Sequence, residues 1–116
     1  MGNTIIEKII KHNTGAAQVK PGDIVTVNVD RVMIHDIFIP FVADKFEEMG
    51  FKKLWDPDRV VLIYDHLVPA SQLDDTRHFR VGDAFAARYG MKNVHRSDGI
   101  CHQLMTEAGY VKPGDV

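Results

Sequence analysis

The chain has 116 residues, enough for one domain with a packed core, because 45% of the residues are apolar and 26% are charged. The formal net charge is -2 with both signs interspersed, which excludes the clustered basic surface that nucleic acid or an anionic membrane requires. No apolar run approaches the ~20 residues that span a bilayer. The single cysteine, Cys101, excludes an internal disulfide and favours a reducing, cytoplasmic location.

The first 30 residues predict a helix followed by a strand. Thr4 and Glu7 have the spacing of a capping box, and isoleucines recur at helical intervals over residues 4–13. The sequence VKPGDI at 19–24 then contains a Pro-Gly-Asp turn. Because valines alternate with polar residues after this turn, we expect a strand over residues 24–29.

Strands and helices alternate through the rest of the chain, which shows no linker and is treated as a single domain, 1–116. Five elements are expected in this order: a helix at 40–50, a strand at 60–64, a helix from the N-cap Ser71 to Tyr89, a strand at 91–94 and a helix at 99–109. The run VVLIY at 60–64 is continuously apolar and β-branched, as is typical of a parallel strand buried on both faces. The alternation predicts an α/β fold with three layers, α/β/α, around a mainly parallel sheet.

Polar pairs stand at the ends of three apolar runs. They are His35-Asp36 after residues 32–34, Asp65-His66 after residues 60–64, and His102-Gln103 at the start of the last helix. Open α/β sheets keep their ligand sites at the carboxyl ends of the strands. A histidine beside a carboxylate has its proton oriented and its charged form favoured, as a general acid requires. These pairs are therefore the candidate site.

A zinc centre is the main alternative use of six histidines. The chain has no His-Glu-x-x-His motif, no cysteine pair and no two histidines within one helical turn, so local spacing does not indicate a zinc site. Cys101 is expected as a small buried residue. The other histidines, His12, His78 and His95, have polar neighbours and are expected on the surface.

Five segments in order resemble the start of aconitase-superfamily large subunits, of the 3-isopropylmalate dehydratase, homoaconitase and 2,3-dimethylmalate dehydratase type. The segments are TIIEKIIKH, VKPGDIVTVNVD, IHDIFIP, DPDRVVLIYDHLVPA and GICHQLMTEAGYVKPGD. Together they cover nearly the whole chain. The resemblance implies part of an aconitase-type N-terminal domain.

The resemblance also implies a hydro-lyase that removes water from, and re-adds it to, a hydroxy-dicarboxylic acid such as 3-isopropylmalate, in leucine biosynthesis. A 4Fe-4S cluster would act as the Lewis acid of the complete enzyme, and a small subunit would be the protein partner. By position, Asp65 and His66 match the catalytic pair near the departing hydroxyl, and His102 matches the second catalytic histidine. His35 matches a substrate-binding position, and histidine there is similar to the isopropylmalate dehydratase branch.

Members of this family continue beyond the second VKPGD sequence, at 111–115, with a strand, an Asp-Ser-His motif and, much later, three cysteines. We therefore expect the chain to be an N-terminal fragment that holds no cluster by itself and that self-associates through apolar surface. Two alternatives stay open. One is a stand-alone, non-catalytic module that binds dicarboxylates or serves as a scaffold, and the other is a metal-dependent hydrolase built on the histidines.

Overall fold

Three short segments between residues 32 and 96 form a parallel sheet. The computed structural model describes residues 2–116 and contains strands β1 (Val32–His35), β2 (Val60–Tyr64) and β3 (Asn93–Arg96) in the order β1-β2-β3. Both strand pairs are parallel. β2 is central and all five of its residues are buried, which confirms the interpretation of VVLIY.

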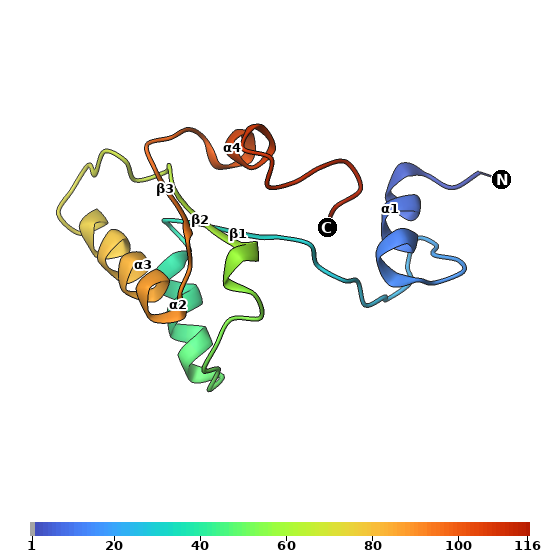
Figure 1. The fold of residues 1–116 in the computed structure, drawn as a ribbon, viewed down its shortest axis with the longest axis horizontal. Coiled ribbons are helices and arrows are strands. Elements are labelled where there is room, and N and C mark those ends of the chain that lie inside the picture. The colour runs from blue at the N-terminus through green and yellow to red at the C-terminus, as the bar shows by residue number, and fades with distance from the viewer. Residues whose placement is uncertain (1) are drawn as a thin grey trace.

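Two helices cover one face of the sheet. The helices are α2 (Ile39–Glu48) and α3 (Asp75–Tyr89), which lie side by side on the same side of the strands in Figure 1. Alternate residues of β2 face them and join one core, which contains Val60, Leu62, Tyr64, Ile39, Phe85, Ala86 and Tyr89. Because side chains alternate across a strand, the residues between these must face the other way.

The opposite face of the sheet is covered by α4 (Cys101–Glu107). Val61 and Ile63 of β2 pack there against Cys101 and Met105. The sheet therefore has helices on both faces, and the predicted three-layer α/β/α arrangement is confirmed. Cys101 is wholly buried, as expected.

The N-terminal helix α1 (Ile5–Thr14) lies apart from the sheet, at the far end of the molecule from α3 (Figure 1). Its capping box is formed as predicted, since Thr4 accepts from the Glu7 N–H and the Glu7 carboxylate accepts from the Thr4 N–H. The side chain of Asn13 donates to the Gly114 carbonyl at 3.0 Å and so ties α1 to the C-terminal turn.

The strand expected over residues 24–29 is wrong. This segment forms no strand, and its one backbone hydrogen bond outside the turn runs from the Asn28 N–H to the Asn13 carbonyl at 2.9 Å. Ile24 is fully exposed. The alternation of valines with polar residues predicted a strand. Within residues 2–116, however, no neighbouring strand lies beside the segment to form the backbone hydrogen bonds of a ladder.

The expected start of the third helix is also wrong, because α3 begins at Asp75 and not after Ser71. The buried Asp75 carboxylate accepts from the Ser71 N–H at 2.8 Å, the Ser71 hydroxyl at 2.9 Å and the Gln72 N–H at 3.1 Å. These bonds organise a loop before the helix, so the serine is a donor to Asp75 and not a cap. The hydrogen bonds from Ser71 hold the pKa of Asp75 below its usual value.

The helices α1, α2 and α4 and the strand β3 agree closely with the expectations, whereas β1 was not among the expected strands. α2 begins one residue before Pro40, and β3 lies two residues later than predicted. A short 3-10 helix, η1 (Pro57–Arg59), occupies the Asp-Pro-Asp turn before β2. In the described part of the chain, no helix has both the length and the apolar character that crossing a bilayer takes.

Candidate active site

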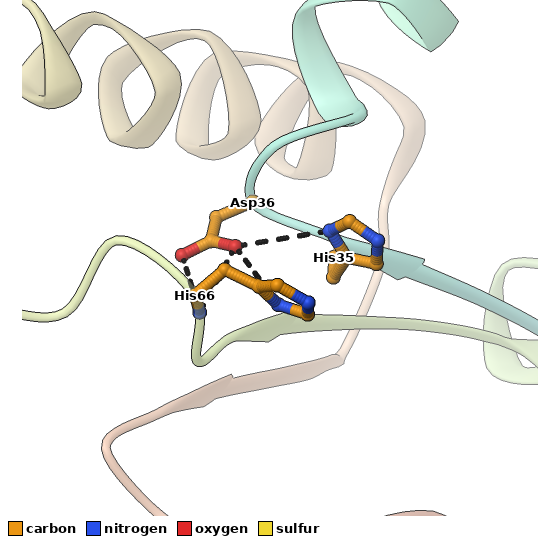
Figure 2. Close-up of side chains that lie close together, drawn as sticks. All are labelled: His35, Asp36 and His66. Atoms are coloured by element: carbon orange, nitrogen blue, oxygen red, sulfur yellow. Dashed lines mark hydrogen bonds and ion pairs between the residues drawn. The ribbon is translucent and has the colours of Figure 1, made fainter. Parts of the chain in front are cut away.

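The carboxyl ends of β1 and β2 lie side by side and bring two polar pairs together. In the parallel register His35 lies opposite Ile63, and the Asp36 N–H donates to the Ile63 carbonyl at 3.1 Å. The imidazole rings of His35 and His66 consequently stack, with centroids 4.0 Å apart and planes 20° apart (Figure 2). The sheet thus joins residues that are 31 positions apart in sequence.

Asp65 and His66 form a tight hydrogen-bonded pair. Oδ1 of Asp65 lies 2.6 Å from Nδ1 of His66, and Oδ2 accepts from the Cys101 N–H at 2.6 Å. Burial raises the pKa of Asp65, but these hydrogen bonds outweigh it and bring the pKa below its usual value. The group is therefore a carboxylate that accepts from Nδ1–H of His66. The other ring nitrogen, Nε2, points away from Asp36 in Figure 2 and is left for a further partner.

The Asp36 carboxylate fixes the backbone on both sides of the site by accepting hydrogen bonds from it. Its side chain is wholly buried and accepts from the N–H groups of Ile37 at 3.0 Å, His66 at 3.2 Å and Leu67 at 2.8 Å. Its carbonyl lies 2.9 Å from Nδ1 of His78. Asp36 was expected beside His35 but was assigned no role. Its position directly after a strand is the same signal that identified Asp65. His78, expected on the surface, is half-buried in this contact.

His35 is the most enclosed histidine of the site. Its side chain is 14% exposed, and its Nδ1 lies 3.9 Å from Oδ1 of Asp36, too far for a hydrogen bond. Within residues 2–116 this buried nitrogen has no hydrogen-bond partner. Burial lowers the pKa of His35, and the neighbouring His66 lowers it further. The ring is therefore held in its neutral form at neutral pH.

α4 brings the third predicted pair to the same edge of the sheet. The Cys101 N–H is fixed by Asp65, so His102 follows directly from a residue that contacts the site. The His102 side chain is exposed, and its charge lies near enough to lower the pKa of His35. Gln103 lies outside the site, since its side chain donates to Glu107 one turn later at 2.6 Å.

Cys101 borders this cluster through its backbone N–H, whereas His95 and His12 take no part in it. Burial raises the pKa of the Cys101 thiol, and Asp65 adds to the effect, so the thiol stays protonated. His95, expected on the surface, is half-buried between Asp98 at 2.8 Å and the Tyr110 hydroxyl at 2.7 Å. His12 is exposed in α1, as expected. The site is thus a carboxylate-bound imidazole, with a second imidazole stacked on it and a third nearby.

Comparisons with known proteins identify the family of the chain. The Aconitase family (aconitate hydratase) matches residues 7–116. The chain is 38% identical over its full length to the 3-isopropylmalate dehydratase large subunit 1 of Methanopyrus kandleri and 39% identical to the 3-isopropylmalate dehydratase large subunit of Methanoregula boonei. Over 95% of its length it is 37% identical to a probable methanogen homoaconitase large subunit of Methanothermobacter thermautotrophicus.

The chain belongs to the aconitase family, as its five segments predicted. Its α/β layers with a parallel sheet are those of an aconitase-type domain. The chain spans 28% of the length of the Methanopyrus kandleri and Methanoregula boonei subunits and 27% of the homoaconitase subunit.

Proposed function

We propose that the chain supplies the proton-handling part of a hydro-lyase that acts on a hydroxy-dicarboxylic acid such as 3-isopropylmalate. The observation that carries this proposal is the 2.6 Å contact between Asp65 and His66 at the carboxyl end of the central strand. The family and the names of the relatives support it. The role belongs to leucine biosynthesis in the cytoplasm, with a small dehydratase subunit as partner.

In the proposed reaction His66 is the general acid. Elimination of water breaks a C–O bond on one carbon and a C–H bond on its neighbour, so the departing hydroxide must receive a proton and a separate base of the complete enzyme must take the proton from carbon. With Nδ1–H held by Asp65, Nε2 of the protonated His66 can deliver a proton, and the Asp65 carboxylate keeps the ring oriented for this transfer. His35 contacts the substrate, and His102 is the second catalytic histidine.

The family implies a 4Fe-4S cluster as the Lewis acid of the complete enzyme. Such clusters are held by several cysteine thiolates, whereas the chain has one cysteine, which is wholly buried. The residues of this chain therefore do not fit the cluster, and we assign it no ligand among them. What the chain contributes is the orientation and transfer of protons.

The test uses the complete large subunit, assembled anaerobically with its small subunit and assayed on a panel of 2- and 3-hydroxy diacids. His66→Ala will lower kcat by about 10²–10⁴-fold with little change in KM, because the proton transfer is made only in the transition state. Asp65→Asn will act in the same direction. The double variant will be little worse than the worse single one, since the two residues act as a unit.

His12→Ala is the matched control, because His12 is exposed in α1, far from the sheet, and it will leave kcat unchanged. A His66→Ala enzyme with near-normal kcat and an intact cluster would defeat the assignment. Simple additivity of the two losses would show that Asp65 and His66 act separately. Tight binding of a dicarboxylate by a complete protein that turns over none of the panel would favour the non-catalytic alternative.

A further inference from the structure

Three metal-binding atoms converge where β1 and β2 end. Nδ1 of His35 and Nδ1 of His66 lie 3.9 Å and 3.7 Å from Oδ1 of Asp36, and the cluster offers three ligand atoms within 4.8 Å of one another (Figure 2). Two imidazoles and one carboxylate are a common donor set for divalent transition metals. We propose that His35, Asp36 and His66 form a binding site for a divalent transition-metal ion such as Zn²⁺ or Co²⁺.

The two distances from the histidines to Asp36 are close to the spacing of ligand atoms around such an ion. Ligand atoms about 2.1 Å from a tetrahedral ion lie roughly 3.4 Å apart. The two observed distances to Asp36 exceed this by only a few tenths of an ångström. Nδ1 of His35 is also buried without a hydrogen-bond partner among the described residues. An ion beside Asp36 would give this nitrogen the partner it lacks.

The charges around the position also suit a dication. Asp36 is wholly buried, and within residues 2–116 only the two histidines lie within ion-pair distance of its carboxylate. Three backbone N–H groups fix that carboxylate in place. The Asp65 carboxylate lies 2.6 Å from Nδ1 of His66, so two negative groups flank the place of the ion.

Coordination requires one movement. An imidazole binds a metal in the plane of its ring, and one ion cannot lie in the planes of two rings stacked 4.0 Å apart. His66 is the ring that can turn, because its side chain is 39% exposed whereas that of His35 is 14% exposed. Turning it replaces the hydrogen bond to Asp65 with the metal, and the Nδ1 proton moves to Nε2 or leaves to solvent, because only a deprotonated ring nitrogen binds a metal. If the proposed function holds, a bound ion therefore blocks proton donation by His66.

A second set of donors, Asp65, His66 and Cys101, lies beside the first. Its thiol is wholly buried between β2 and α4, where it packs on Val61 and Ile63. An ion there would have to displace packed groups, so the first set is the one we assign.

The test is a titration of the 116-residue chain with Zn²⁺, by calorimetry, and with Co²⁺, by absorption spectroscopy. We expect about one equivalent bound, with no thiolate-to-cobalt charge-transfer band. His35→Ala and His66→Ala will each weaken binding by about tenfold or more, since each removes a ligand. His12→Ala and Cys101→Ser will bind like the wild-type chain. Because no turnover is measured, the result is independent of the proposed function.

Imidazole nitrogen NMR on the wild-type chain keeps the proposal testable if a variant does not fold. Zn²⁺ should shift the ring nitrogens of His35 and His66 at one equivalent and leave those of His12 unmoved. Unchanged affinity in His35→Ala, or zinc shifts confined to other histidines, would overturn the proposal. A thiolate band that disappears in Cys101→Ser would also overturn it, by placing the ion at the second set.

Discussion

Gly82 of α3 packs against Tyr64, the last residue of β2 and the neighbour of Asp65. A Cβ atom at position 82 would overlap the Tyr64 hydroxyl and lie 3.1 Å from Cζ and 3.2 Å from Cε1 of the ring. The ring has little freedom to retreat, because the Arg96 guanidinium lies over it, 4.3 Å from the centroid. We therefore predict that Gly82→Ala destabilises the chain.

The expected change in the free energy of unfolding is the balance of two effects of Gly82→Ala. Overpacking of this kind costs about 1–3 kcal/mol, whereas alanine is better than glycine within a helix by about 1 kcal/mol. We expect Gly82→Ala to lower the free energy of unfolding by about 1 kcal/mol. Tyr64→Phe removes the 2.8 Å hydrogen bond to the Asp83 carboxylate and costs about 1 kcal/mol. Without the hydroxyl the main overlap is gone, so Gly82→Ala should then be neutral or slightly stabilising.

Urea unfolding followed by circular dichroism on all four members of this cycle measures the coupling, which we expect to be about 1–2 kcal/mol. Ala84→Gly, at an exposed position of the same helix, measures helix propensity alone and should cost about 1 kcal/mol. Effects of Gly82→Ala and Tyr64→Phe that add to within about 0.5 kcal/mol would refute the reasoning. So would a Gly82→Ala chain more stable than the wild type.

Three further outcomes are expected. Asp75 has a depressed pKa, so its contribution to stability is complete above its unfolded pKa of about 3.9 and is lost as pH falls through the lower folded value. Asp75→Asn should therefore lower the urea midpoint near pH 7 and change it much less near pH 2.5. Anaerobic reconstitution of the 116-residue chain should give no iron and sulfide at cluster stoichiometry. Sedimentation should show self-association, because Ile24, Phe41 and Leu73 are among many exposed large apolar side chains; a monomer at all concentrations would contradict this.

The layered part of the fold was predictable because its signals are local. A continuous apolar run of β-branched residues is stable only when both faces are covered, and VVLIY at 60–64 is buried throughout. Gly15 and Gly90 end α1 and α3 in the left-handed conformation, with φ of 70° and 71°, which glycine adopts without strain. The start of α3 was missed because Ser71 has a cap-forming side chain but donates to Asp75, and the N-cap residue Asp74 makes no side-chain cap hydrogen bond.

The members of the candidate site were predictable, but their contacts were not. His35, Asp65 and His66 each follow an apolar run, which the sequence shows directly. The stacking of His35 on His66 depends on the register of β1 against β2, and a shift of one residue would turn these side chains to opposite faces. The contact of Asp65 with the Cys101 N–H spans 36 positions and depends on where α4 begins. Both contacts therefore form only in the assembled sheet and are not specified by the local sequence.

The two copies of VKPGD show how far a local sequence decides structure. In both turns the aspartate accepts from the lysine N–H, Asp23 from Lys20 at 2.8 Å and Asp115 from Lys112 at 3.0 Å. The glycines, Gly22 and Gly114, have φ of 94° and 100°. The five residues thus fix the same turn twice.

The structure beyond each turn depends on the backbone that lies beside it. After the first turn, residues 24–29 form no strand and have no ladder partner among residues 2–116. After the second turn, the Val116 carbonyl accepts from the N–H groups of Asp30 and Arg31, and the Val116 N–H donates to the Asp30 carboxylate. A turn orients the chain that leaves it, but a strand also needs a second row of N–H and carbonyl groups. This is why the same five residues predicted the turn correctly and the strand at 24–29 incorrectly.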